Sequence, residues 1–79
     1  MELSKNVIDF CLALTFKTKE LFFFNKLNDN DICSLNNPLF FNKLEPRFIE
    51  FINKHRLQNK LPSRIYKEIN NAANVRSLH

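Results

Sequence analysis

Four side chains of this 79-residue chain belong to the types that most often ligate metals or attack substrates, namely Cys11, Cys33, His55 and His79. Zinc sites usually take their ligands from close pairs a few residues apart. None of the separations here matches such a pair, so the sequence predicts no metal site. Cys11 and His55 are also a nucleophile and a base by type, and such partners need only be adjacent in space. Both fall on apolar faces of expected helices, which favours a core cysteine and a hydrogen-bonded core histidine over a catalytic pair.

The segment Asp29-Asn30-Asp31 resembles the first residues of a calcium-binding loop. The turn glycine of such a loop is missing, and Phe40 stands where the loop needs its bidentate glutamate. The sequence therefore predicts a solvated turn with self-capping carboxylates.

The chain contains no glycine. This excludes a glycine-rich phosphate loop, a dinucleotide-binding fingerprint and an EF-hand. Two-residue hairpins also lose their preferred turn residue, which disfavours an all-β fold. We expect no cofactor and no enzymatic activity.

The length fits a single domain over residues 1–79. A domain of this size buries only about 60% of its unfolded surface, which favours a binding module over an enzyme. Glycine and tryptophan are absent while asparagine, lysine, phenylalanine and isoleucine are abundant. Such a composition is typical of AT-rich coding DNA, as in a phage or another mobile element.

The positive charge is concentrated in the second half of the chain. Residues 1–40 carry four basic and five acidic groups, whereas residues 41–79 carry eight basic and three acidic groups. The two halves thus have net charges of −1 and +5, which together give the +4 of the whole chain. A basic half suits an acidic protein surface or a nucleic acid, and it is equally consistent with a solvated helix surface.

The most apolar stretch, residues 7–16, is too short to span a bilayer and is not followed by a small-residue cleavage site. We therefore expect a cytoplasmic protein with no membrane partner and no disulfide.

The hydrophobic spacing predicts an all-α domain of about four helices. The first covers residues 5–16, where Ser4 is the expected N-cap and Asp9 and Ala13 fall opposite the apolar face. Its apolar face is formed by Val7, Ile8, Cys11, Leu12 and Leu14. The second helix is expected over residues 19–27, although its run of phenylalanines would also suit a short buried strand.

A loop that holds at most a single turn is expected over residues 28–37, before the third helix at 38–59. Pro46 should kink or break this helix, because an interior proline removes a hydrogen bond and clashes with the preceding turn. The last helix is expected at 63–75, with a frayed tail at 74–79.

Without glycine, the helix ends must use other residues. Asparagine tolerates the left-handed conformation best after glycine, so Asn28, Asn59 and Asn70 or Asn71 are the expected helix ends. The prolines at positions 38, 46 and 62 are expected to mark the remaining helix boundaries.

Nine phenylalanines are more than so small a core needs. Phe10, Phe48 and Phe51 fall within apolar arcs of expected helices. The surplus at 22–24 and at Phe40 and Phe41 indicates a protein interface or a homodimer contact. Stacking platforms for single-stranded nucleic acid are the alternative use of exposed aromatic rings.

The C-terminal half resembles the Hha/YmoA family of small helical proteins that modulate the nucleoid silencer H-NS. The segment FFNKLEPRFIEF, Phe40 to Phe51, is similar to the third helix of that family. With one inserted residue, KLPSRIYKEI, Lys60 to Ile69, is similar to its closing segment. Two upstream segments, SKNVIDF and KTKEL, are loosely similar to its first two helices.

This resemblance implies a four-helix fold and a nucleoid-associated co-regulator that docks on the N-terminal dimerisation region of H-NS. The acidic residue that makes this contact in the family would be Glu45, and the arginine that follows it would be Arg47. A carboxylate at such a contact forms a directional, charge-assisted pair with an arginine of the partner.

The chain departs from the family pattern in two places. Pro46 replaces a histidine at the expected contact, and the basic cluster of the first helix is absent. Direct DNA contact is therefore expected only through phosphates. The candidate residues for it are Lys43, Arg47, Lys54, Arg56, Lys60, Arg64 and Lys67.

Three functions follow from these patterns. The first is an Hha-like modulator of the H-NS silencing complex that acts through protein–protein contact. The second is a phage or mobile-element protein that binds and inhibits a host protein, and the third is an autonomous basic nucleic-acid-binding domain.

Overall fold

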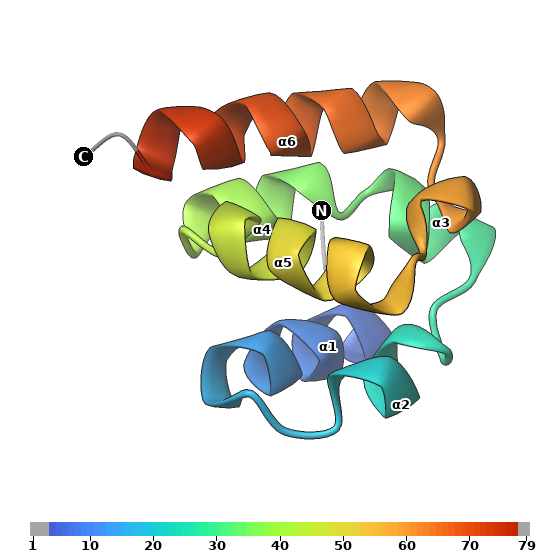
Figure 1. Cartoon of the computed structure of the whole chain (residues 1–79). Helices are drawn as coiled ribbons and strands as arrows, with labels where there is room; N and C mark the ends of the chain where they lie inside the picture. Colours follow the sequence, from blue (N-terminus) through green and yellow to red (C-terminus); the bar gives the residue numbers. More distant parts are fainter. Residues whose placement is uncertain (1–3, 78–79) are drawn as a thin grey trace.

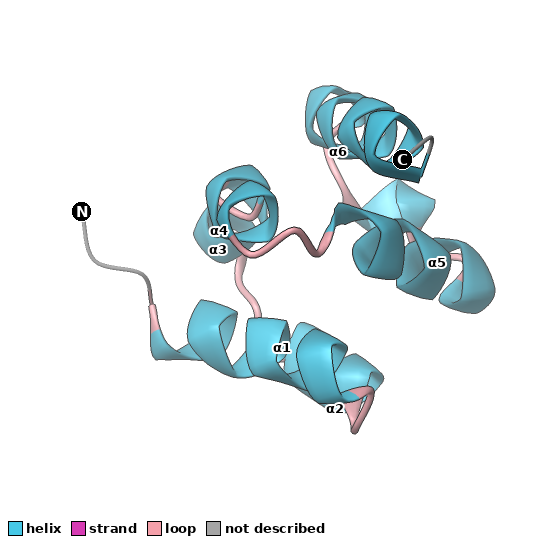
Figure 2. Ribbon diagram, turned by 90° about the vertical axis from the view of Figure 1, so that its left-hand side faces the viewer, coloured by secondary structure: helices cyan, strands magenta, loops and turns pink. Residues whose placement is uncertain are grey.

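The computed structural model describes residues 4–77, and all the regular elements in this range are helices (Figure 1). They are α1 (Lys5–Phe16), α2 (Glu20–Phe24), α3 (Asp29–Cys33), α4 (Asn36–Phe41), α5 (Glu45–His55), the 3-10 turn η1 (Gln58–Lys60) and α6 (Ser63–Ser77). α1 and α2 form one side of the molecule, α4 and α5 lie in the middle, and α6 covers the opposite side (Figures 1 and 2). The expected small all-α domain is confirmed, with six α-helices within residues 4–77 in place of the expected four.

Ser4 caps α1 as the sequence predicts. Its hydroxyl oxygen accepts a hydrogen bond from the Val7 amide at 3.2 Å, which satisfies a free N–H of the first turn. The same hydroxyl donates to a carboxylate oxygen of Asp31 at 2.8 Å. One small side chain thus fixes both where α1 begins and where α3 lies beside it.

Phenylalanines from three helices meet in the core. The Phe10 ring of α1 lies 5.5 Å from Phe24 of α2, 6.0 Å from Phe48 and 5.6 Å from Phe51, both of α5. Tilted and edge-to-face pairs at these distances stabilise beyond simple burial. Burial of Phe10, Phe48 and Phe51 agrees with the sequence pattern, whereas Phe24, expected among the surplus rings, is also core.

The segments before α5 are helical in short pieces. Residues 20–24 form helix and not strand, and the loop expected at 28–37 contains α3. A capping box starts α3, because the Asn28 side chain accepts from the Asp31 amide while the Asp31 carboxylate accepts from the Asn28 amide. Pro38 is the third residue of α4, still within the first turn where proline is tolerated.

The break expected at Pro46 is present and comes slightly earlier. α4 ends at Phe41, and α5 starts at Glu45 with Pro46 as its second residue. α5 then ends at His55, so residues 56–59 do not continue this helix as the sequence pattern predicted.

Basic residues, and not asparagines, take the left-handed conformation. Lys17, Lys19, Lys43 and Arg56 have φ between 53° and 59°. At the ends of α1, α4 and α5 the amide after the left-handed residue donates to the carbonyl five residues earlier. This is the Schellman arrangement, in which glycine usually stands at the left-handed position. The prediction that asparagines take these positions is therefore wrong, and Asn28 starts a helix.

α6 is longer than expected. It continues to Ser77, two residues beyond the predicted end at residue 75, while residues 78 and 79 lie outside the described range. The physical reason is an ion pair in the last turns of α6, between Arg76 and Glu45.

Candidate functional site

Glu45, the expected contact residue for an arginine of a partner, is paired within the chain. Its side chain is only 1% exposed, and both its carboxylate oxygens accept hydrogen bonds at 2.8 Å from the guanidinium of Arg76. These hydrogen bonds raise the pKa of Arg76 above its ordinary value, against the opposing effect of partial burial. Contact between Glu45 and a partner arginine therefore requires that Arg76 first moves away.

Arg47, two residues later, holds α5 against α1. Its guanidinium donates to the Leu14 carbonyl at 3.2 Å and to the Thr15 carbonyl, both in the last turn of α1. A helix C-terminus leaves its carbonyl groups free and has a partial negative charge, so an arginine is well suited to cap it. The side chain thus has a structural role and keeps its remaining N–H groups for other contacts.

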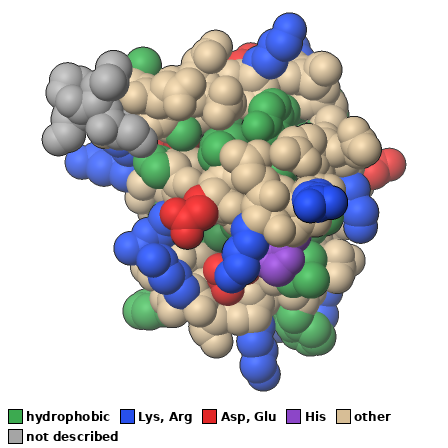
Figure 3. Space-filling view, in the orientation of Figure 1, with side chains coloured by type: hydrophobic (Ala, Val, Ile, Leu, Met, Phe, Trp, Pro, Cys, Tyr) green, Lys and Arg blue, Asp and Glu red, His purple; other side chains and the backbone are tan. Residues whose placement is uncertain are grey.

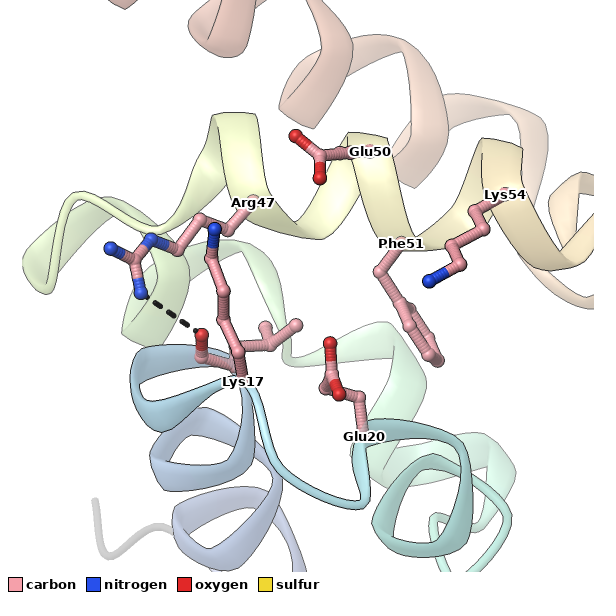
Figure 4. Close-up of a pocket in the computed structure, with 7 residues that line it drawn as sticks. Lys17, Glu20, Arg47, Glu50, Phe51 and Lys54 are labelled. Carbon is pink, nitrogen blue, oxygen red and sulfur yellow. Dashed lines mark hydrogen bonds between the residues drawn. The ribbon is translucent and has the colours of Figure 1, made fainter.

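Arg47 also borders a surface depression of about 320 Å³ between α5, the end of α1 and the start of α2 (Figure 4). Lys17, Glu20, Glu50, Phe51 and Lys54 line it as well. In Figure 4 the Lys17 side chain points toward α5 beside Arg47, and the Phe51 ring points toward Glu20 from above.

The charges around this depression are of both signs. Three cationic and two acidic side chains line it. They form no salt bridge with one another, since the salt bridge found within residues 4–77 is the Glu45–Arg76 pair, which lies elsewhere. Ligand pockets usually combine an apolar wall with a few converging polar groups. Five of the seven side chains that line this depression are charged, so it lacks the mainly apolar wall of such a pocket.

Phe40 and Phe41, the two rings expected at an interface, have different surroundings. Phe40 is half-buried and packs against the core. Phe41 is 88% exposed at the last residue of α4. An exposed ring of this size at a helix end is a suitable anchor for a protein partner.

Besides Arg47, the other six candidate phosphate contacts are all exposed, but they are distributed over different elements. Lys43 follows α4, Lys54 lies on α5, Arg56 and Lys60 lie in the connection after it, and Arg64 and Lys67 lie on α6. Figure 3 shows basic side chains separated by neutral and acidic atoms on the face it presents. The structure does not bring these residues together in one cluster around a groove.

Sequence reasoning missed the exposed side of α1. Ile8 and Leu12, expected on its buried face, are 45% and 51% exposed, whereas Ala13, expected opposite, is buried. Phe16, on the same side as Ile8 and Leu12, is 71% exposed. The signal was present in the sequence, because the apolar residues of α1 cover an arc too wide for one contact face.

Cys11 is buried, as the sequence predicts for a small core residue. Burial raises the pKa of its thiol to about 11, so the thiol is protonated at neutral pH. His55 is exposed beside the Phe51 ring, with the ring centres 4.9 Å apart, so the interpretation as a core histidine is wrong. Residues 4–77 contain no group of three or more His, Cys, Asp or Glu side chains arranged to hold a metal ion.

Comparison with known proteins gives no relative: no protein-family model, no curated protein and no solved structure matches the chain. Among the helices of the described range, none has the length and apolar character needed to cross a membrane.

Proposed function

We propose that the chain is a non-enzymatic helical binding protein of the Hha type, which modulates an H-NS silencing complex through protein–protein contact. The observation that supports it most is the placement of the two segments that resemble the family. The segment 40–51 contributes to α4 and α5, and the segment 60–69 contributes to α6. α5 packs on α6 more extensively than any other pair of helices within residues 4–77. The two similar segments thus form one structural unit.

Phe41 and Glu45 are the contact residues of this proposal. Phe41 stands exposed at the end of α4, four residues before Glu45, and needs no rearrangement to reach a partner. Glu45 needs an exchange, in which an arginine of the partner replaces Arg76 on the buried carboxylate. Because one bidentate pair replaces another of the same kind, the exchange conserves the charge-assisted hydrogen bonds.

Calorimetric titration of the full chain with full-length H-NS tests this proposal. Phe41→Ser should weaken binding at least tenfold. The control is Val75→Ser, which alters an exposed apolar residue on a different helix, α6, and should leave binding unchanged. Arg76→Gln should tighten binding, because it removes the internal competitor for Glu45, provided that circular dichroism shows the variant to be folded. The proposal is wrong if wild-type protein does not bind H-NS or if Phe41→Ser binds as well as wild type.

A second candidate function is binding and inhibition of a host protein by a mobile-element product. The exposed apolar residues on α1, α2 and α4 favour it, because an apolar surface that gathers such side chains often marks a site of protein–protein interaction. Affinity capture from host lysate, followed by mass spectrometry, separates the two candidates. H-NS as the dominant captured protein supports the first, and a single unrelated protein that is lost with Phe41→Ser supports the second.

A further inference from the structure

The outer ridge of α1, defined as Ile8, Leu12 and Phe16, is an apolar surface that no described element covers. These residues are spaced four apart and so follow one another along one side of the helix. Each is between 45% and 71% exposed, while the opposite side of α1 is buried in the core. No charged residue occurs between Phe10 and Phe16. A contiguous apolar surface of this kind on a small protein often marks an interaction site.

The ridge includes a receptor for one large side chain. Ile8, Cys11, Leu12 and Thr15, together with Asn42, line a surface depression of about 170 Å³. The four α1 residues have the spacing i, i+3, i+4 and i+7, which is the four-residue hole that receives a side chain from a facing helix. An apolar cavity of about 150 Å³ is large enough for a benzene ring in another protein. The depression therefore fits one leucine or phenylalanine of a partner helix.

The charges near the ridge decide between a second copy and a different protein. Lys5 precedes the ridge on the same side of α1, Lys19 follows its end, and Lys43 is next to Asn42 at the depression. All three lysines are exposed, and the salt bridge that residues 4–77 form involves none of them. Asp9 is the one acidic residue of α1.

Two copies of this face would bring like charges together. Each copy has a net charge of +4, and two facing ridges would bring the exposed lysines beside one ridge close to those beside the other. Like charges that meet at a contact oppose association. A partner with carboxylates beside its apolar residues has no such penalty.

We propose that the outer ridge of α1 binds an amphipathic helix of another protein, whose apolar side chains are flanked by aspartate or glutamate. One large apolar side chain of that helix occupies the depression between Ile8 and Thr15, and its carboxylates lie against Lys5 and Lys43. This is the helix-in-groove mode, in which a few anchors at helical spacing provide most of the affinity. Asn42 and Lys43 lie between Phe41 and Glu45, so this surface adjoins the contact of the proposed function, but it does not depend on the silencer as partner.

Selection from a library of stapled helical peptides on the full chain tests the proposal. The ridge positions of the peptides vary among Leu, Ile, Phe and Ser, and the flanking positions vary between Glu and Lys. We expect enrichment of large apolar residues on the ridge and of Glu on the flanks. The best peptide should bind at least tenfold more weakly to Leu12→Asp and to Phe16→Ser, and equally well to the control Val75→Asp.

Two further measurements complete the test. Raising the salt concentration should weaken the binding of the best peptide, because salt screens the attraction between its carboxylates and the exposed lysines that they face. Peptides with Lys flanks, or peptides that bind Leu12→Asp as well as wild type, would overturn the proposal, as would the absence of enrichment. A dimer in sedimentation that Leu12→Asp abolishes would also overturn it, because it would assign the ridge to a second copy. Leu12 and Phe16 are both more than half exposed, and thermal unfolding of the two variants controls for loss of fold.

Discussion

Replacement of Arg56 by glycine should stabilise the protein, because Arg56 is held in a conformation that only glycine adopts without cost. Its φ is 55°, and the next amide donates to the Ile52 carbonyl at 2.9 Å to close the end of α5. A side chain with a Cβ atom loses about 1–2 kcal/mol in this left-handed region. Glycine avoids that cost but loses about 0.5–1 kcal/mol more conformational entropy on folding. The net gain in unfolding free energy should therefore be about 0.5–1 kcal/mol.

For a domain of 79 residues this gain corresponds to a rise of about 2–8 °C in Tm. Thermal and urea unfolding followed by circular dichroism measure it. Lys43→Gly, at the other end of α5, should give a similar gain, and the two gains should add because the sites are far apart. Arg56→Ala is the matched control, since it removes the same charge from the helix end but keeps the Cβ atom, and it should not stabilise.

A second control tests whether the backbone angle is the cause. Lys67 is exposed within α6, where glycine should lower the unfolding free energy by about 1 kcal/mol. If Arg56→Gly destabilises as Lys67→Gly does, while Arg56→Ala behaves like wild type, the reasoning from the left-handed helix end is refuted.

Three further predictions concern the capping network, the ion pair and the buried thiol. Ser4→Ala should lower the unfolding free energy by about 1–2 kcal/mol in urea, because it removes both the cap of α1 and the hydrogen bond to Asp31, and no loss would contradict this role. Arg76→Gln should lower Tm more than Glu45→Gln, because it leaves a buried carboxylate without its charged partner, and equal losses would contradict the asymmetry. The stability contribution of Cys11 should be constant below pH 9 and decline between pH 9 and about 11, because the unfolded thiol ionises first. Urea unfolding of wild type and Cys11→Ala across this range measures it, and parallel pH profiles would contradict it.

The local signals in the sequence were sufficient for the fold class and for several helix boundaries. Ser4 marks the start of α1 because a hydroxyl oxygen there meets an unsatisfied amide, and this depends only on neighbouring residues. Pro46 similarly forces a restart, since in a continuous helix its ring would clash with the carbonyl four residues earlier and it has no N–H to donate. Such effects act within one turn and can be read from spacing alone.

The features that sequence reasoning missed depend on contacts between distant residues. Arg76 stabilises the end of α6 only because the fold brings it to Glu45, 31 positions earlier in the sequence. Likewise, which side of α1 faces the core depends on where α5 lies, so Ile8 and Leu12 were assigned to the wrong side. At the helix ends, the intrinsic tolerance of positive φ favours asparagine, but α1, α4 and α5 end at positions where the left-handed residue is a lysine or an arginine.

The left-handed residues lower the free energy of unfolding, and a partner bound to the outer ridge of α1 would raise it. Four residues with a Cβ atom in this conformation together oppose folding by several kcal/mol, since each costs about 1–2 kcal/mol. Small domains are stable by only about 5–15 kcal/mol, so this is a large fraction. A partner that binds the folded ridge and not the unfolded chain would add about 2.7 kcal/mol at a concentration a hundred times its Kd. That gain exceeds the effect expected from Arg56→Gly. A peptide helix that binds the outer ridge should therefore raise Tm by more than Arg56→Gly or Lys43→Gly does. A ridge-binding peptide that leaves Tm unchanged at this concentration would mean that it does not select the folded α1.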